Sequence, residues 1–205
     1  SIYSAKHSKK KSAEKFNRLK AFVKTYDKIT NKIEKDFNKK EEAKILYLIS
    51  KTGFRIGSEK ETGAKVKAYG ASTLTSNHIK INGNKIKFNF IGKKGVEINH
   101  ILEDEKLSKL LKNKKGKLFS ISDNDVRKYL KKVDKRFKIK DFRTYVGTST
   151  ALESISKMKK PITEKELKKA INKVCKDVAD KLGNTASVAK KAYISPEVWD
   201  QWQVE

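Results

Sequence analysis

The sequence predicts a mainly helical α+β fold, in which a helical domain contains one small antiparallel sheet. Two observations support this prediction. Apolar residues recur at the spacing of amphipathic helices over about the first 50 residues and again after residue 103. Between these regions the pattern changes to alternating and β-branched residues, interrupted by the hairpin turn signals Asn82-Gly83-Asn84 and Gly92-Lys93-Lys94-Gly95.

Local signals place the individual elements. Helices should end at Gly53 and Gly183, and others should begin at capping boxes opened by Ser122 and Thr163. The predicted helices span residues 12–37, 41–50, 104–112, 122–133, 140–157 and 161–182, followed by a short helix that bears Tyr193 and a last one that starts at Pro196. The predicted strands span residues 69–74, 78–82, 85–91 and 96–101. Residues 1–11 are polar and basic, and we expect them to form an arm or linker beside one domain of residues 12–205.

The charge of the chain limits its possible partners. Its 205 residues include 50 Lys and Arg against 24 Asp and Glu, a formal net charge of +26. Such an excess repels itself in a compact chain and favours a polyanion, so we expect a nucleic acid as the partner, with an anionic membrane surface as the alternative. The sequence shows no long apolar span and no secretory signal, which argues against a membrane or secreted protein.

Cysteine and histidine are too scarce for disulfides or a metal centre. The single cysteine, Cys175, excludes an internal disulfide and fits a reducing compartment, so we expect the cytoplasm or, if the protein is viral, a nucleus or a virion. The three histidines are scattered, which argues against a zinc site. We expect no metal and no cofactor.

Arginine is rare, because all but five of the 50 basic residues are lysine. Where only charge is needed this chain uses lysine, so an arginine indicates a task such as planar, bidentate binding of a phosphate. We assign such a task to Arg55 and Arg143. Arg18, Arg127 and Arg136 lie on lysine-rich helical faces, and we assign them no arginine-specific role.

Four residues in order along the chain indicate one reaction. Arg55 follows the glycine that ends a helix, Lys93 occupies a hairpin tip, Arg143 lies near a helix start, and Tyr193 follows a short basic segment. A tyrosine can act as a nucleophile, and cations can stabilise the charge that develops on a phosphate. The set therefore indicates phosphoryl transfer on DNA, although Tyr193 alone is more often a half-buried aromatic residue and Lys93 alone a solvated turn residue.

These segments together resemble the catalytic domain of type IB DNA topoisomerases, of the small poxvirus, giant-virus and bacterial kind. The resemblance is collinear and extends over nearly the whole chain. The matching segments are Tyr3-Ser4 with Lys15-Phe16-Asn17-Arg18-Leu19, Phe54-Arg55-Ile56-Gly57, Tyr69-Gly70-Ala71-Ser72-Thr73-Leu74 with His78-Ile79, Phe90-Ile91-Gly92-Lys93, Asp141-Phe142-Arg143-Thr144-Tyr145, and Leu182-Gly183-Asn184-Thr185 with Lys191-Ala192-Tyr193-Ile194.

The resemblance implies the fold shared by type IB topoisomerases and tyrosine recombinases. It also implies relaxation of supercoiled DNA through a 3′-phosphotyrosyl intermediate, without ATP or metal, by a monomer. The catalytic residues would be Arg55, Lys93, Arg143, Asn184 and Tyr193, where Asn184 replaces the histidine of the poxvirus pattern. The expected DNA contacts are Tyr69, His78, Lys94, Lys190 and Lys191. In the family a small β-rich domain precedes Tyr3-Ser4, so we expect this chain to be the catalytic part of a larger DNA clamp.

Several alternatives stay open. A tyrosine recombinase or integrase shares the order Arg, Lys, Arg, Tyr, but Arg143-Thr144-Tyr145 stands where a His-x-x-Arg pair is expected. A non-catalytic DNA-binding module would use the same charge without chemistry. Asn184 and Asp141 can each serve as a helix N-cap, and Lys94 competes with Lys93 for the role at the hairpin tip.

Overall fold

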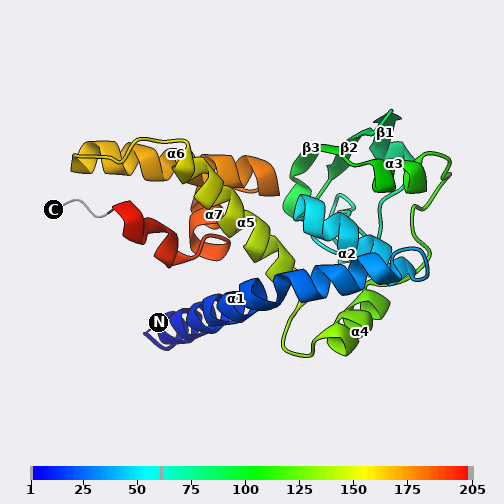
Figure 1. The fold of residues 1–205 in the computed structure, drawn as a ribbon, viewed down its shortest axis with the longest axis horizontal. Helices are drawn as coiled ribbons and strands as arrows, with labels where there is room; N and C mark the ends of the chain where they lie inside the picture. Colours follow the sequence, from blue (N-terminus) through cyan, green and yellow to red (C-terminus); the bar gives the residue numbers. More distant parts are fainter. Residues whose placement is uncertain (1, 61, 203–205) are drawn as a thin grey trace.

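The computed structural model describes residues 2–60 and 62–202 and confirms the mainly helical α+β fold. In Figure 1, helix α1 (Ile2–Asp36) runs lengthwise through the lower half of the molecule, and α5 (Ile139–Ser156) rises obliquely from it. On one side of α5 lie α2 (Glu41–Thr52), the sheet, α3 (Glu105–Leu111) and α4 (Asp123–Val133). On the other side lie α6 (Glu164–Leu182), α7 (Ala186–Ala192) and the 3-10 helix η3 (Pro196–Trp202).

Two hydrophobic clusters hold these groups together, and α5 belongs to both. The first cluster joins α1, α2, the sheet, α4 and the start of α5, with the fully buried rings of Phe22 and Phe142 5.0 Å apart. The second joins the later part of α5 to α6, α7 and η3 through residues such as Val174 and Ile194. Because α5 gives Phe142 to the first cluster and Ala151 to the second, the region between these residues lies where the two clusters meet.

The sheet is a three-stranded antiparallel meander that presents a hairpin tip. The 3-10 helix η1 (Ser76–His78) leads into β1 (Ile79–Asn82), which pairs with β2 (Lys85–Ile91), and β2 pairs with β3 (Glu97–Glu103). Residues of β2 alternate between buried and exposed positions, as expected when only one face of a sheet is covered. The turn from β2 to β3 contains η2 (Lys93–Gly95), in which Lys94 has a φ of 63°, a strained value for a residue other than glycine.

The strand predicted over residues 69–74 is wrong. This segment turns instead, with the Thr73 amide donating to the Gly70 carbonyl at 2.9 Å, and it lies against the chain that follows α2. The Ala71 amide donates to the Arg55 carbonyl at 2.8 Å. Glycine makes this approach possible, because a Cβ on Gly70 would lie 2.3 Å from the backbone nitrogen of Gly57. The segment therefore supports the backbone of Arg55 rather than extending the sheet.

The other predicted elements are confirmed within a few residues, apart from the start of α1. The Ser122 and Thr163 side chains cap α4 and α6 as predicted, and Gly53 and Gly183 end α2 and α6 in left-handed conformation. Residues 4–11, expected to form an arm or linker, are exposed turns of α1, which continues through them without a break.

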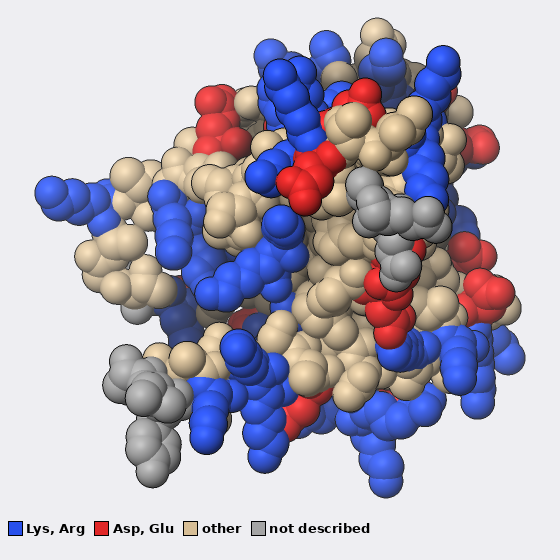
Figure 2. Space-filling view, turned by 90° about the vertical axis from the view of Figure 1, so that its left-hand side faces the viewer, with Lys and Arg blue, Asp and Glu red and all other residues tan. Residues whose placement is uncertain are grey.

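Basic residues dominate the surface. Figure 2 shows Lys and Arg side chains around most of one face of the molecule, with acidic side chains in smaller groups among them. Within residues 2–60 and 62–202, no helix is both long enough and apolar enough to cross a membrane.

Candidate active site

A large basic cleft opens where the two hydrophobic clusters meet. It has a volume of about 1290 Å³, larger than the roughly 300–1,000 Å³ typical of small-molecule pockets. Its walls come from the chain after α2, the loop before η1, the hairpin tip, α4, the start of α5, and Tyr193. Among the described residues of its lining, ten are Lys or Arg and one, Glu59, is acidic. A cleft of this size and charge fits a polyanionic chain.

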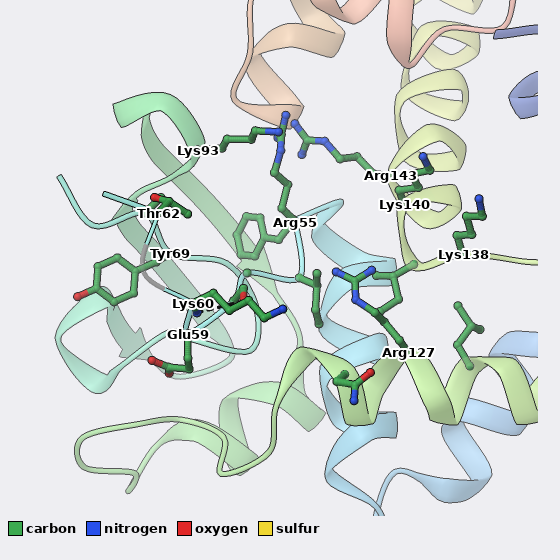
Figure 3. Close-up of a pocket in the computed structure, with 18 of the residues that line it drawn as sticks. Arg55, Glu59, Lys60, Thr62, Tyr69, Lys93, Arg127, Lys138, Lys140 and Arg143 are labelled. Atoms are coloured by element: carbon green, nitrogen blue, oxygen red, sulfur yellow. Dashed lines mark hydrogen bonds between the residues drawn. The ribbon is translucent and has the colours of Figure 1, made fainter. Parts of the chain in front are cut away.

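Three cations from separate segments converge inside this cleft. In Figure 3, Lys93 extends from the hairpin tip, Arg143 from α5 and Arg55 from the chain after α2, and their nitrogen atoms point toward one another. Holding like charges together is unfavourable without a partner, so the arrangement favours an anion between them. Tyr193 lines the same cleft.

The hydroxyl of Tyr193 is held within this group of cations. The Arg55 Nη2 donates to the Tyr193 Oη at 3.3 Å, and the guanidinium carbon of Arg143 lies 4.7 Å from the centre of the Tyr193 ring. Burial by itself raises the pKa of the Tyr193 phenol. The positive charges of Arg143, and then of Arg55 and Lys93, outweigh burial, so the phenol pKa lies below its ordinary value. The cations therefore make the phenolate, the nucleophilic form of tyrosine, easier to form than it is for a tyrosine in water.

Tyr193 is the residue after α7, and its backbone packs closely on α5. Thr148 Oγ1 donates to the Tyr193 carbonyl at 3.0 Å and accepts from the Ser195 amide at 3.2 Å. A Cβ on Gly147 would lie 2.8 Å from the Tyr193 carbonyl oxygen and 2.9 Å from the Tyr193 Cβ. The absence of a side chain at Gly147 thus permits the position that Tyr193 takes.

Arg143 has a structural function besides its place in the cleft. It is buried, and its Nη1 and Nη2 each donate at 2.8 Å, to the carbonyls of Gly53 and Leu182 respectively. Gly53 is the C-cap of α2 and Leu182 is the last residue of α6, so one guanidinium bonds to the ends of both helices. Burial lowers the pKa of Arg143 to about 10, which leaves it charged at neutral pH. Its buried Nε has no hydrogen-bond partner among residues 2–60 and 62–202.

Asn184 is not among the residues that line the cleft. It follows the Leu182 and Gly183 pair at the end of α6, and both polar atoms of its side chain are buried with no hydrogen-bond partner in the described part of the chain. The alternative that Asn184 caps the next helix is excluded, because Thr185 caps α7 by accepting from the Val188 amide.

The five predicted DNA contacts fall in three places. Tyr69 lines the cleft, and its ring lies 4.3 Å from that of His78, whose Nδ1 accepts from the Thr75 amide at 3.0 Å. Lys94 lies at the exposed hairpin tip, outside the cleft lining. Lys190 and Lys191, on α7, border a second, smaller groove next to α1 and η3.

Sequence reasoning missed several residues at or near the cleft. Lys138 and Lys140 line it at the start of α5, and Lys140 could have been found because it precedes Arg143 by three residues on a predicted helix. Arg127 lines it on α4. No sequence signal pointed to Thr148 or Gly147.

The prediction that Arg18 has no arginine-specific role is wrong. Its Nε and Nη2 bind both carboxylate oxygens of the buried Asp141, at 2.8–3.0 Å. Asp141 is not the N-cap of α5. It lies three residues after the N-cap Lys138 and accepts from the Lys138 amide at 2.8 Å.

Within the described residues, no three His, Cys, Asp or Glu side chains gather into a group that could hold a metal ion. His100 is buried in the core, where burial and then the charge of Lys181 lower its pKa to about 4. Cys175 is buried in the second cluster, and burial raises the pKa of its thiol. Neither residue lies in the cleft lining.

The fold and site define a helical protein in which a hairpin lysine and two arginines surround one tyrosine in a basic cleft. The family model of the eukaryotic DNA topoisomerase I catalytic core matches residues 4–202, and the chain belongs to this type IB topoisomerase family. It is 29% identical over 220 residues to DNA topoisomerase 1B of Acanthamoeba polyphaga mimivirus, an alignment that covers 94% of this chain and 65% of that protein.

The chain is also similar to DNA topoisomerase 1 of Homo sapiens and of Mus musculus. Each is 27% identical over 170 residues, which covers 74% of this chain and 22% of the mammalian protein. The chain thus spans about 65% of the viral relative and about a fifth of the mammalian ones.

Proposed function

We propose that this protein cuts and rejoins one strand of duplex DNA through a covalent bond to Tyr193, and thereby relaxes supercoils. The observation that supports this most directly is the Tyr193 hydroxyl, bonded to Arg55 and lying beside Arg143 in a cleft lined by ten basic residues. DNA is the proposed substrate because the similar proteins are named DNA topoisomerases.

In the proposed reaction the Tyr193 oxygen attacks a backbone phosphorus. A bond forms between that oxygen and the phosphorus, and the bond from the phosphorus to the 5′-oxygen of the next nucleotide breaks. The phenol proton leaves before or during attack, and the departing 5′-oxygen takes a proton and becomes a hydroxyl. The reverse reaction restores the strand and releases the tyrosine. Because one phosphodiester replaces another, no nucleotide hydrolysis is needed.

The cations would act on different oxygens of the phosphate. Arg55 and Arg143 would stabilise the non-bridging oxygens, which gain negative charge in the transition state. Lys93, at the hairpin tip, would donate the proton to the departing 5′-oxygen as general acid. Asn184 would contribute a fifth contact once DNA binds. Its two unpartnered polar atoms support that role, since buried polar groups without partners are rare in native proteins.

We further propose that duplex DNA lies across the cleft and contacts Tyr69, with His78 supporting that ring. Lys94, Lys190 and Lys191 would bind phosphates outside the cleft. Three further predictions stay open to test. They are that the protein acts as a monomer, that residues 12–205 are the catalytic domain of a larger clamp, and that it is located in the cytoplasm, a nucleus or a virion.

Trapping the covalent intermediate tests the proposal. Adding denaturant during the reaction is expected to yield protein bound to the 3′ end of a nicked strand, and a supercoiled plasmid without special sites is expected to relax in excess EDTA. Relaxation that requires two cognate sites would indicate a tyrosine recombinase instead. DNA binding without any trapped adduct would indicate a non-catalytic module, and strict dependence on Mg²⁺ would contradict the metal-free mechanism.

Lysine substitutions separate the two arginines. Arg55→Lys and Arg143→Lys should each slow cleavage by ~10²-fold or more, since an ammonium cannot replace a planar fork at a phosphate. Only Arg143→Lys should also lower the free energy of unfolding, by about 1–3 kcal/mol, because one buried carbonyl, of Gly53 or Leu182, loses its partner. Single-turnover cleavage and chemical denaturation measure the two effects. Near-normal cleavage by both variants would show that neither arginine takes part in the reaction.

A further inference from the structure

Side chains from two other helices hold the peptide groups on either side of Tyr193. Lys15 Nζ, on α1, donates to the Ala192 carbonyl at 2.5 Å. Thr148 Oγ1, on α5, donates to the Tyr193 carbonyl at 3.0 Å. The first carbonyl belongs to the planar peptide group before the Tyr193 Cα, and the second to the group after it. The two contacts together fix both backbone torsions of Tyr193, and with them the direction in which its side chain leaves the chain.

Helix α7 depends on such external contacts. It has seven residues, and an isolated helix of that length is unstable in water. It ends at Ala192, and Tyr193 has non-helical torsions of φ −127° and ψ −7°. The last carbonyls of a helix have no partner within the helix, and a cation there also interacts favourably with the helix dipole. Lys15 meets both needs at the residue before Tyr193.

Lys15 differs from the many solvated lysines of this chain. It is half-buried, and its Nζ lies 4.4 Å from the centre of the Phe16 ring. Burial, and then the charges of Lys140 and Arg18, lower the pKa of Lys15 to about 8. Placing an ammonium in such surroundings is unfavourable, and a surface lysine would supply the same charge to DNA without that cost. We therefore attribute the position of Lys15 to its hydrogen bond with the Ala192 carbonyl and not to its charge alone.

The next turn of α1 makes a second contact with the site. Arg18 lies three residues after Lys15, on the same face of the helix, and binds Asp141, which is two residues before Arg143. One face of α1 is thus fastened both to the segment that bears the tyrosine and to the helix that bears an arginine of the cleft.

We propose that Lys15 is a positioning residue for Tyr193: by holding the Ala192 carbonyl it sets the phenol against the scissile phosphate, and through it α1 controls the rate of strand cleavage. The inference rests on the proposed function, in which Tyr193 is the nucleophile.

Three variants test this role. Lys15→Met removes the donor and keeps a similar apolar stem, and Lys15→Arg restores a donor. Lys20→Met is the matched control, because Lys20 also joins α1 to the C-terminal segment, through an exposed ion pair with Glu197 at 2.5 Å. Exposed pairs of this kind contribute little to stability. The measurements are the single-turnover cleavage rate at saturating DNA, the affinity for DNA, and the melting temperature.

Lys15→Met is expected to cleave roughly ten- to a hundredfold more slowly at saturating DNA, because displacing a reacting group by about 1 Å can cost that much. Its affinity for DNA should change no more than that of Lys20→Met, which loses the same charge. Lys15→Arg is expected to recover most of the rate, and Lys20→Met to cleave like the wild type.

A wild-type cleavage rate in Lys15→Met would overturn the inference, as would a loss confined to affinity or shared equally with Lys20→Met. If Lys15→Met does not stay folded, Lys15→Gln gives the same test with a shorter donor and should cleave at an intermediate rate, and a folded Lys15→Gln at wild-type rate would also overturn it. Adduct formation by Tyr193→Phe would instead overturn the assignment of the nucleophile, so the two failures can be told apart.

Discussion

Tyr193→Phe is expected to abolish the covalent adduct with DNA while leaving the affinity for duplex DNA within about twofold. The substitution removes one oxygen and its hydrogen bond from Arg55. The ring stays, with Arg143 beside it, and the backbone contact with Thr148 does not involve the lost atom. Since nucleophilic catalysis needs that oxygen, this variant should still bind DNA but should not cleave it.

Denaturing gel electrophoresis of labelled DNA after a quench measures the adduct, and a binding assay at the same salt concentration measures the affinity. Salt must be matched because contacts with phosphates weaken steeply as it rises. Tyr26→Phe is the control, since Tyr26 stacks on Tyr145 with ring centres 3.9 Å apart and does not line the cleft. Adduct at the wild-type level in Tyr193→Phe would mean that another residue attacks the phosphate.

Lys93→Ala is expected to cleave normal DNA ~10²-fold or more slowly and to recover most of that loss on a substrate with sulfur in place of the bridging 5′-oxygen. A 5′-alkoxide is a poor leaving group and needs a proton, whereas a thiolate has a much lower conjugate pKa and needs none. Arg143→Ala should not recover to the same degree, because its charge would act on the non-bridging oxygens.

Lys94→Ala is the matched control for the hairpin, and it should be mild on both substrates. Lys94 is the adjacent residue, but its left-handed backbone and its position outside the cleft lining separate it from Lys93. Single-turnover rates on the two substrates give the comparison. Rescue of Lys94→Ala in place of Lys93→Ala would show that Lys94 is the general acid. Rescue of neither variant would show that the general acid does not lie on the hairpin.

The elements that sequence predicted well are those specified by short-range signals. The strand predicted over residues 85–91 has those bounds in β2, because alternating apolar residues and two turns define it locally. The helix predicted over residues 41–50 extends to Thr52, next to the glycine expected to end it. The segment 69–74 has β-like composition, but a long-range approach to the backbone after α2 determines its conformation, and composition does not report such contacts.

The same distinction applies to the site. Arg55, Lys93, Arg143 and Tyr193 were predicted from their contexts, and all four line one cleft. Lys15 could not be distinguished from the other lysines, because what sets it apart is a carbonyl 177 positions along the chain. The pairing of Arg18 with Asp141 spans 123 positions and was hidden for the same reason.

The proposed reacting groups are divided between the two hydrophobic clusters. Arg55 and Lys93 lie on segments packed into the first hydrophobic cluster, and Tyr193 packs against the second. Arg143 lies between them and bonds to a carbonyl on each side. The geometry of the site therefore depends on how the two clusters pack against each other. A shift of one cluster against the other by about 1 Å would move Tyr193 relative to its cations and would slow the proposed cleavage, although no residue of the site had changed.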